Sequence, residues 1–232
     1  MYLAIDTSTE IASIALAREG EVLAELTWRS GQNHSVELLP NLEHLLAQAG
    51  LTIEAALGII VARGPGSFNG LRVGISTAKG LAFSRGIPIV GLSTLEVAAY
   101  PHALTGRPVR PIFNAGRGEI ATATYQQQGD RWQTLEPEHL TVIDRLCAEI
   151  ATPTVFCGEP GPAIIDELNQ RLGGRAVIPP PAARLRRAAF LAELGYRRLQ
   201  TGPPDDPTTL QPLYLRRPSI TRPRPDKDWR PR

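Results

Sequence analysis

Residues 57–91 read LGIIVARGPGSFNGLRVGISTAKGLAFSRGIPIVG and hold two short apolar runs separated by a longer segment. The runs, 57–62 and 87–91, are unbroken and of strand length, which is typical of strands buried on both faces. Between them we expect a helix that follows the loop 64–70 and ends at Gly86, because glycine commonly follows the last helical residue. The stretch therefore predicts a strand, a helix and a strand in succession, the repeating unit of an α/β fold.

The residues before this stretch predict three strands and a helix. Apolar runs separated by polar turns cover residues 2–6, 11–17 and 22–28, and the last two form a hairpin. A helix is expected between there and Gly50, since apolar side chains recur at helical spacing. These side chains are Val36, Leu39, Leu42, Leu46 and Ala49. Pro40 should kink this helix or confine its regular part to the residues after it.

The residues after the stretch predict a second set of strands and helices. Ser93 and Glu96 have the spacing of a capping box, in which each side chain bonds a backbone N–H at the start of a helix. Strands are expected at 108–114, 119–125, 131–135, 154–157 and 176–178, and helices at 142–150, 163–172 and 184–200. The prediction is an α/β protein of two subdomains, 1–107 and 108–201. Residues 202–232 follow as a tail rich in proline and arginine, expected to be partly disordered.

The charge of the chain excludes a polycation or an acidic disordered protein. The 232 residues carry 25 Lys and Arg against 23 Asp and Glu, a formal net charge of +2. Residues 216–232 hold seven positive and two negative side chains, a local charge of +5, so the rest sums to −3. This basic tail is a candidate contact for RNA. A general bias of the chain toward arginine explains the tail equally well.

Other classes of site and location are excluded by what the sequence lacks. No apolar run approaches the roughly 18 residues of a membrane helix, and no charged leader precedes the first apolar run, so we expect a cytoplasmic protein. Cys147 and Cys157 have no neighbouring Cys or clustered His, which supports neither a disulfide nor a zinc site. His34 and His44 are ten residues apart and point to nearly opposite sides of the predicted helix. No metal site is therefore predicted.

The glycine-rich loop 64–70 matches neither standard phosphate-binding motif. A P-loop would need Gly-Lys-Ser/Thr after a glycine and four residues, and the dinucleotide pattern would need a third glycine at position 69. A Gly64-Pro-Gly66 turn remains, followed by Ser67, which can cap a helix whose backbone N–H groups attract anions. Arg72 adds positive charge to this candidate anion site. A tight turn that joins strand to helix without a ligand is the competing interpretation.

A second candidate contact for an anion or nucleotide lies at the end of the first strand, where Asp6, Thr7 and Ser8 follow apolar residues. Actin-like and sugar-kinase-like folds hold phosphate and metal at a comparable strand, turn and strand. Those folds normally place a glycine after the aspartate, so that backbone N–H groups approach the phosphate. Thr7 and Ser8 stand there instead, which weakens the case for a nucleotide.

Small residues recur along the helix predicted after the loop, at Gly70, Gly74, Ala78 and Gly80. A glycine inside a helix costs about 1 kcal/mol of stability relative to alanine. We therefore expect these glycines to allow a favourable contact that a larger side chain would block. Close approach of another helix is the simplest reason. That helix belongs either to the same chain or to another one, and both alternatives stay open.

Five segments together resemble the TsaB family, also called YeaZ. They are residues 6–10 (DTSTE), 33–40 (NHSVELLP), 64–74 (GPGSFNGLRVG), 117–119 (RGE) and 210–216 (LQPLYLR). The chain departs from the family pattern at Asn69, where threonine is usual, and at Asn114 and Gly116, where aspartate and arginine are usual. The resemblance implies two actin-like (ASKHA, ribonuclease H-like) subdomains, each a mixed sheet flanked by helices.

The resemblance also implies a function, that of a non-catalytic partner in making threonylcarbamoyladenosine (t6A) beside the anticodon of tRNAs that read codons beginning with A. Its implied partners are the transferase TsaD, as a heterodimer, and the ATPase TsaE, with tRNA reached through the complex. A homodimer stays open for the chain alone. No cofactor is implied for the isolated chain, and ATP or ADP at the TsaD interface is left open. The competing hypothesis is an actin-like phosphotransferase or ATPase that uses Asp6 and the loop 64–70.

Members of this family pair through two helices of the first subdomain. Carried over to this chain, the interface is expected at His34, Ser35, Leu38, Leu39, Leu42, Gly70, Leu71, Val73, Gly74 and Thr77. Such an interface would supply the close helix partner that Gly70 and Gly74 call for.

Overall fold

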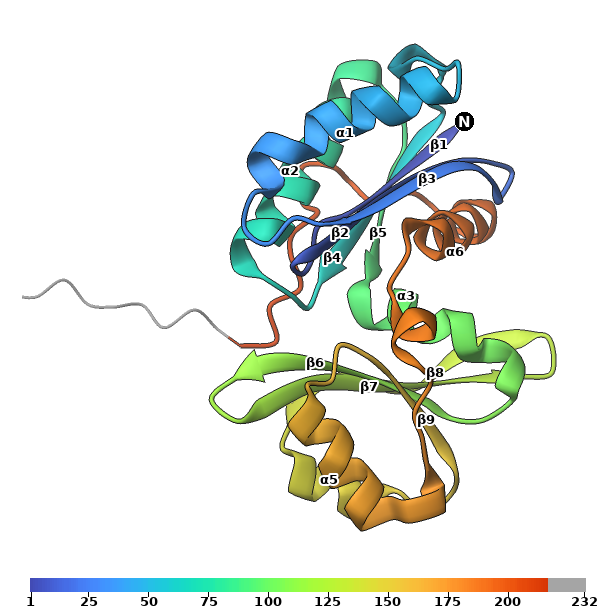
Figure 1. The fold of residues 1–232 in the computed structure, drawn as a ribbon. Helices are drawn as coiled ribbons and strands as arrows, with labels where there is room; N and C mark the ends of the chain where they lie inside the picture. The colour runs from blue at the N-terminus through green and yellow to red at the C-terminus, as the bar shows by residue number, and fades with distance from the viewer. Residues whose placement is uncertain (217–232) are drawn as a thin grey trace, which may run out of the picture.

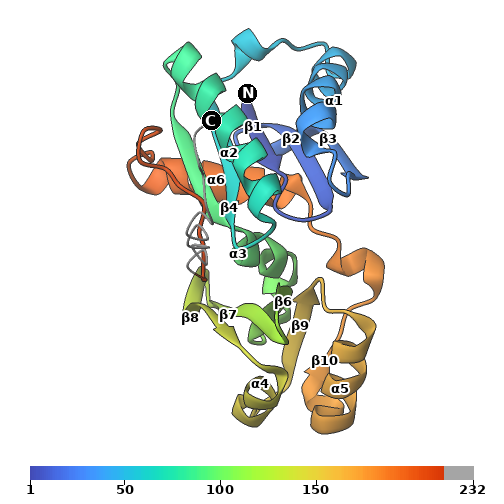
Figure 2. The ribbon, with the colours of Figure 1, turned by 90° about the vertical axis from the view of Figure 1, so that its left-hand side faces the viewer.

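The computed structural model describes residues 1–216, which form two α/β subdomains, drawn one above the other in Figure 1. Each subdomain is built on one five-stranded sheet. Figure 2 shows the chain passing between them at α3 (Thr94–Ala99) and again before α6 (Ala188–Thr201). Within these 216 residues, no helix has the length and apolar character needed to cross a membrane.

The first sheet combines a three-stranded meander with two parallel strands. Its strands are β1 (Tyr2–Asp6), β2 (Ile11–Arg18), β3 (Glu21–Arg29), β4 (Gly58–Gly64) and β5 (Ile89–Ser93). β1 pairs antiparallel with β2 and parallel with β4, which gives the order β3-β2-β1-β4-β5. The apolar run of β4 is buried almost throughout, as predicted for a strand in the middle of an α/β sheet.

Alternation along β1 divides the core of the first subdomain between two faces. Leu3 and Ile5 point to the face covered by α1 (His34–Gln48) and α2 (Phe68–Arg85). Ala4 belongs to the opposite cluster, which α6 completes. Figure 1 shows α1 and α2 on one side of the sheet and α6 on the other. Because successive side chains of a strand point to opposite faces, the larger Leu3 and Ile5 pack beneath α1 and α2, and the small Ala4 packs beneath α6.

The second sheet repeats the strand order of the first. Its strands are β6 (Val109–Gly116), β7 (Glu119–Gln128), β8 (Arg131–Thr141), β9 (Thr154–Gly158) and β10 (Ala176–Val177). The order β10-β9-β6-β7-β8 is again a meander with two parallel strands beside its first member. Both sheets therefore have the same strand order and the same strand directions.

Helices cover both faces of the second sheet as well. α4 (Ile143–Glu149) and α5 (Pro162–Leu172) pack on one face, and α3 packs on the other. Short 3-10 helices complete the chain at Ile53–Ala55, Tyr100–Thr105, Gly173–Arg175 and Pro181–Arg184. Two mixed five-stranded sheets flanked by helices confirm the predicted fold class.

The last helix differs from its prediction in extent and in position. α6 begins at Ala188 rather than at 184, because Pro181–Arg184 forms a separate 3-10 turn. It packs on the first sheet, whereas the sequence placed it in the second subdomain. Gly195 permits this packing, since a Cβ there would lie 2.3 Å from Ile60 Cγ2 in β4. The chain thus returns to the first subdomain after completing the second.

Residues 205–213, which follow α6, also lie on the first subdomain. Asp205 N donates to Ile89 O at 2.9 Å, and Leu213 N donates to Arg63 O at 2.7 Å. Leu210 is buried in the core beneath α2. Part of the predicted tail is therefore packed against β4 and β5. Most of its arginine-rich end, 217–232, lies outside the described residues.

One of the two outcomes expected at Pro40, and the cap expected at Ser93, are not found. Pro40 does not confine the first helix, because α1 runs from His34 through Pro40 to Gln48, and its packing on the sheet outweighs one missing hydrogen bond. Ser93 precedes α3 but its side chain makes no capping hydrogen bond. Ser93 is still paired with Gly64 as the last residue of β5, so the strand rather than the helix sets its side-chain direction.

Candidate functional site

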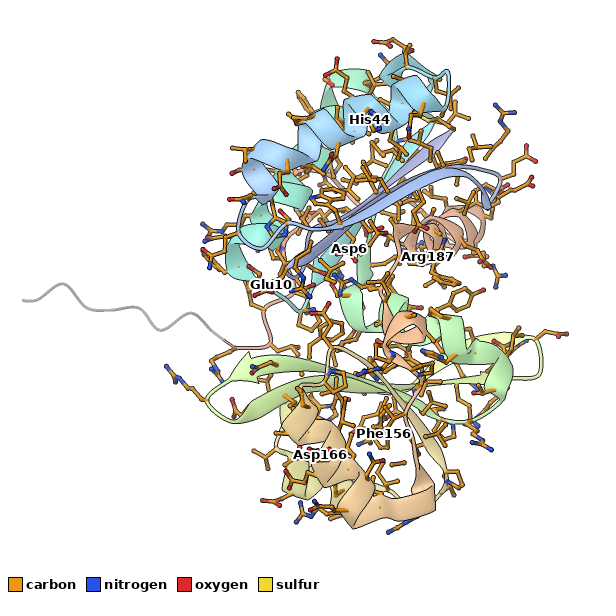
Figure 3. All side chains as sticks on the ribbon, in the orientation of Figure 1. Asp6, Glu10, His44, Phe156, Asp166 and Arg187 are labelled. Atoms are coloured by element: carbon orange, nitrogen blue, oxygen red, sulfur yellow. The ribbon has the colours of Figure 1, made fainter. Side chains whose placement is uncertain are left out.

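Asp6 ends β1, and its carboxylate is completely buried. Oδ1 accepts hydrogen bonds from Ser8 N at 2.9 Å and from Ser8 Oγ at 2.6 Å. Oδ2 accepts a hydrogen bond from Arg186 Nε at 2.5 Å. Figure 3 shows Asp6 at the end of the first sheet that faces the second subdomain. Both carboxylate oxygens are thus bonded by groups of the same chain.

Arg186 links this carboxylate to the second subdomain. The residue lies just before α6 and is 3% exposed as a whole. Nη1 donates to Glu159 Oε1 at 2.8 Å, and Nη2 donates to Thr9 Oγ1 and Ile11 O, both at 3.0 Å. Burial alone would lower the pKa of Arg186, but the Asp6 and Glu159 carboxylates outweigh it and raise that pKa. The guanidinium is therefore a fixed positive charge between the subdomains.

This ion pair decides what Asp6 can do chemically. The guanidinium of Arg186 supplies the positive charge that a metal ion would supply beside a phosphate-binding aspartate. Within residues 1–216, no set of three or more His, Cys, Asp or Glu side chains is placed to hold a metal ion. The arrangement fits an internal ion pair better than a nucleotide site, because a nucleotide-bound metal would have to displace Arg186.

The loop before α2 is fixed on the turn after β1. Ser67 N donates to Ser8 O at 2.7 Å. A Cβ on Gly66 would lie 2.1 Å from that same carbonyl oxygen, so only glycine fits there. Ser67 Oγ accepts from Gly70 N at 3.3 Å, which confirms the predicted helix cap. Gly64 N donates to Thr94 Oγ1 at 3.1 Å, which ties the loop to α3.

The glycines of α2 approach Thr7 of the same chain. Thr7 Oγ1 donates to Gly70 O at 2.7 Å, and a Cβ on Gly70 would lie 2.2 Å from Thr7 O. A Cβ on Gly74 would lie 2.3 Å from Thr7 Oγ1. Both glycines are buried. A close approach therefore exists at both glycines, but Thr7, the residue after β1 of the same chain, makes it. The expectation that a helix, and in particular a helix of another chain, approaches these two glycines is wrong.

Arg72 lies apart from this cluster. Its guanidinium carbon is 3.9 Å from the centroid of the Phe68 ring, and that ring stacks on Tyr214 with centroids 5.5 Å apart. All three side chains are exposed. The structure therefore brings together Asp6, Thr7, Ser8, Gly66 and Ser67 from the predicted anion site, and places Arg72 in a surface stack.

The predicted partner interface divides by exposure. Ser35 and Leu39 are exposed, and Val73 and Thr77 are half-buried. The other members are buried: His34, Leu38, Leu42, Gly70, Leu71 and Gly74. His34 bonds Thr9 O through Nε2 at 2.8 Å, so it fixes the start of α1 to the β1–β2 turn. The buried residues pack within the subdomain and hold α1 and α2 in place. Only the four exposed or half-buried residues are accessible to a partner.

An apolar groove beside α1 overlaps this predicted interface at Leu39 and Leu42. It is bounded by α1, by the segment after Gly50 and by one residue of α2, and it is called the α1–α2 groove below. It encloses about 560 Å³ and is lined by Leu39, Leu42, Glu43, Leu46, Ala47, Leu51, Thr52, Ile53 and Leu81. Leu39 is 55% exposed, and Val36, nearby on α1, is 69% exposed. Leu51, Ile53 and Leu81 were not among the predicted interface residues. The signal for Leu51 and Ile53 was the apolar character of the segment after Gly50, which the helical pattern of α1 does not include, whereas Leu81 lies within α2.

The departures from the family pattern lie at exposed turns. Asn69 is exposed in the first turn of α2. Asn114 Oδ1 accepts from Gly116 N at 2.8 Å and so closes the turn between β6 and β7. Gly116 has a φ of +74°, a conformation that suits glycine better than the usual arginine. None of these three residues bonds the Asp6 carboxylate or lines the apolar groove.

Comparisons with known proteins agree with this geometry. The family model described as TsaD, tRNA N6-adenosine threonylcarbamoyltransferase, matches residues 21–192. The chain is 33% identical to the tRNA threonylcarbamoyladenosine biosynthesis protein TsaB of Bacillus subtilis over 92% of this chain and 93% of that protein. It is 34% identical to TsaB of Escherichia coli over 59% of this chain and 60% of that protein.

A solved structure from Pseudomonas aeruginosa, described as an uncharacterized protein with similarity to peptidase YeaZ, superposes with a TM-score of 0.78. It is 28% identical, and the match covers 93% of this chain and 99% of that one. The ethanolamine utilization protein EutJ of Carboxydothermus hydrogenoformans, 12% identical with a TM-score of 0.50 over 83% of this chain and 89% of that one, shares the fold alone. Sequence and fold together show that the chain belongs to the TsaB (YeaZ) family, within the wider family that the threonylcarbamoyltransferase model describes.

Proposed function

We propose that the chain is a non-catalytic subunit in the biosynthesis of tRNA threonylcarbamoyladenosine, the process named for its relatives in Bacillus subtilis and Escherichia coli. It binds a TsaD-type transferase and supports transfer of the threonylcarbamoyl group to the adenosine beside the anticodon of tRNAs that read codons beginning with A. The complex acts in the cytoplasm. The observation that carries the proposal is the apolar α1–α2 groove in a chain that matches the transferase family model.

The groove suits a partner of the same fold. Apart from Glu43 and Thr52, its lining is apolar, and Val36 and Leu39 extend the apolar surface along α1. Soluble monomers seldom expose a continuous apolar patch of this kind without using it for binding. A transferase described by the same family model is expected to carry the same two helices. Two such helix pairs can pack face to face about an approximate two-fold axis.

The Asp6 cluster supports a role without catalysis. An actin-like phosphotransferase needs its strand-end aspartate free for a metal ion or a phosphate-bound water. Here Arg186 and Ser8 bond both oxygens of that carboxylate. Exchange of Arg186 for a metal ion would also break its bonds to Glu159 and Thr9. The chain's own guanidinium thus holds Asp6 in a structural role.

Further members of the complex belong to the same proposal. The ATPase TsaE is its third protein, and tRNA is reached through the assembly. ATP or ADP binds at the interface with the transferase and not to the chain alone. A homodimer through the α1–α2 groove is the state expected when the transferase is absent, because the same apolar face is then uncovered.

Depletion of the chain in its host, followed by mass analysis of tRNA nucleosides, tests this function. Threonylcarbamoyladenosine is expected to fall and to return when the wild-type chain is supplied. Leu39→Asp is expected not to restore it, whereas Leu104→Asp is, because Leu104 is 99% exposed and outside the groove. Unchanged threonylcarbamoyladenosine after depletion would end the assignment.

The rival function, a phosphotransferase or ATPase that uses Asp6 and the loop 64–70, has its own readout. It requires ATP turnover by the purified chain without any partner. That turnover would have to disappear in Asp6→Asn while the far-UV circular dichroism of the variant stays unchanged. Our account expects no turnover above the buffer blank.

A further inference from the structure

Three planar side chains form an exposed stack where the segment after α6 passes the start of α2. The guanidinium carbon of Arg72 lies 3.9 Å from the centroid of the Phe68 ring, and the Tyr214 ring stacks on Phe68 at an interplanar angle of 28°. Phe68 is 44% exposed, Tyr214 is 36% exposed, and Arg72 is exposed as well. None of the three lines the α1–α2 groove or bonds the Asp6 carboxylate.

Tyr214 is held in place by contacts of its neighbours in the chain. Leu213 N donates to Arg63 O of β4 at 2.7 Å, and Arg216 pairs with Glu119 of β7. Leu215 packs against the core of the second subdomain. An aromatic side chain fixed on both sides in this way loses little conformational entropy when a ligand stacks on it.

The charges around the stack leave Arg72 unpaired. Residues 55–95, which include all of α2, contain four basic side chains and no Asp or Glu. Carboxylates of neighbouring segments each have a cation of the chain close by: Glu119 has Arg216, Glu10 has Arg29, and Asp206 has Lys79. No carboxylate of residues 1–216 lies within ion-pair distance of Arg72. Its guanidinium is therefore available to an external anion.

The chain runs from this stack into its most basic segment. Arg216 follows Tyr214 by two residues, and residues 216–232 carry seven positive and two negative side chains. The same segment contains one further aromatic residue, Trp229. A local net charge of +5 thus adjoins a stack of aromatic and guanidinium groups in the sequence.

This combination selects the class of ligand. Unstacked bases pack on aromatic rings and on guanidinium planes, and basic side chains bind the phosphates between them. A duplex offers the same phosphates but keeps its bases stacked on one another. We propose that the surface formed by Arg72, Phe68 and Tyr214, together with residues 216–232, binds single-stranded nucleic acid directly. This contact does not depend on the proposed function, in which tRNA is reached through the transferase.

Fluorescence anisotropy of the full chain, without any partner protein, tests the proposal. The probes are labelled single strands of about 15 nucleotides, one of RNA and one of DNA, and a duplex of the same sequence and length. A single strand is expected to bind more tightly than the duplex, with an affinity that falls as salt is raised. The comparison of the RNA and DNA strands shows whether the 2′-hydroxyl contributes to binding.

Two outcomes of this experiment would overturn the proposal. Equal or tighter binding of the duplex would mean that charge alone acts, without stacking of bases. No binding of either single strand, whether or not the chain sediments with vesicles that contain phosphatidylserine, would exclude a nucleic acid as the ligand.

Substitutions within the stack locate the site. Tyr214→Ala and Arg72→Gln should each weaken binding of the single strand about tenfold, because each removes a stacking surface. Phe83→Ala is the matched control for the ring, since Phe83 is 78% exposed near the other end of α2. Arg18→Gln is the matched control for the charge, since Arg18 is exposed at the end of the first sheet away from Asp6. Both controls should bind like wild type.

The Tm of each variant shows whether it is folded. Arg72 is exposed and forms no ion pair within residues 1–216, so Arg72→Gln carries the test if Tyr214→Ala lowers the Tm. Wild-type affinity in Arg72→Gln, or a loss in Arg18→Gln as large as that in Arg72→Gln, would overturn the assignment of the site.

Discussion

Arg186 and Asp6, 180 positions apart in sequence, form an ion pair whose side chains are 2% and 0% exposed. Arg186 also bonds Glu159, and Thr9 Oγ1 donates to the same Glu159 oxygen at 2.7 Å. The pair therefore joins the end of β1 to the segment before α6 and to the second subdomain. It places a buried guanidinium beside the end of β1.

Removal of the guanidinium should destabilise the protein strongly. Arg186→Met leaves the Asp6 carboxylate buried without its cation, and breaking a buried pair in this way costs about 3–5 kcal/mol. Urea unfolding followed by fluorescence measures the change. Arg29→Met is the matched control, since the Arg29–Glu10 pair is largely exposed and should contribute no more than about 1 kcal/mol. Equal effects of the two substitutions would contradict the structural role of Arg186.

Two glycines of α2 should respond oppositely to alanine. At Gly74 a Cβ would lie 2.3 Å from Thr7 Oγ1, so Gly74→Ala should cost about 1–3 kcal/mol of stability. At Gly80 no atom lies within 4 Å of the added Cβ, so Gly80→Ala should stabilise by about 0.4–1 kcal/mol. Chemical unfolding of both variants measures the change in the free energy of unfolding, which should be a decrease for Gly74→Ala and an increase for Gly80→Ala.

A second substitution checks that the contact with Thr7 causes the loss at Gly74. Thr7→Ala removes Oγ1 and with it the hydrogen bond to Gly70 O. Combined with Gly74→Ala, it should cost less than the two single changes added together, because the clash is gone. Additive losses would mean that Thr7 and Gly74 do not interact as described.

The stability of the chain should depend on pH through Glu96. Its pKa is raised above 4.5 by burial and by Glu138, so the folded state holds the proton more tightly than the unfolded state. The resulting stabilisation is complete below the unfolded pKa and is lost as pH rises through the folded pKa. Glu96→Gln carries no charge to bury, so it should raise the Tm at pH 7–8 relative to wild type. That difference should shrink as the pH falls toward 4.5.

Thermal unfolding across this pH range, with Glu43→Gln as control, checks the sign. Glu43 is exposed on α1, and its replacement should leave the Tm profile unchanged. A Tm difference for Glu96→Gln that is constant with pH, or that grows in acid, would contradict the burial of a charge at this position. Glu96 lines a cavity together with Glu138, Arg63, Arg198 and Asp205. These four charged residues are the same in wild type and in Glu96→Gln, so they do not account for a difference in Tm between the two proteins.

The fold could be predicted because local patterns carry it. The three strands at 2–6, 11–17 and 22–28, the meander of the second sheet and the capped start of α2 all follow from periodicity and turn residues. The place of α6 could not be predicted in this way. Its amphipathic pattern shows that one side is buried, but not against which sheet. Contacts between distant parts of the chain settle that, such as the fit of Gly195 against Ile60 and the packing of Leu191 in the same cluster.

The candidate site was predicted less completely, because it too depends on contacts between residues far apart in the sequence. Asp6, Thr7, Ser8, Gly66 and Ser67 come together because strand ends meet at one edge of a sheet. Arg186 has no distinguishing sequence pattern in an arginine-rich chain, and its role depends on a contact over 180 positions. In α1, the predicted apolar spacing identifies the core side only in part, because Val36 and Leu39 are exposed whereas Leu42 and Leu46 are buried. The interface residues came from the family resemblance, which does not separate buried Leu38 and Leu42 from accessible Leu39.

The central claim is that the α1–α2 groove binds a TsaD-type transferase, and titration calorimetry of the two purified proteins from one organism tests it most directly. Leu39→Asp places a charge in the apolar contact and should weaken binding about thirtyfold or more, with the Tm of the isolated chain unchanged. Leu104→Asp, with its leucine 99% exposed elsewhere, should bind like wild type. Wild-type affinity in Leu39→Asp, or no measurable binding by the wild-type chain, would contradict the account.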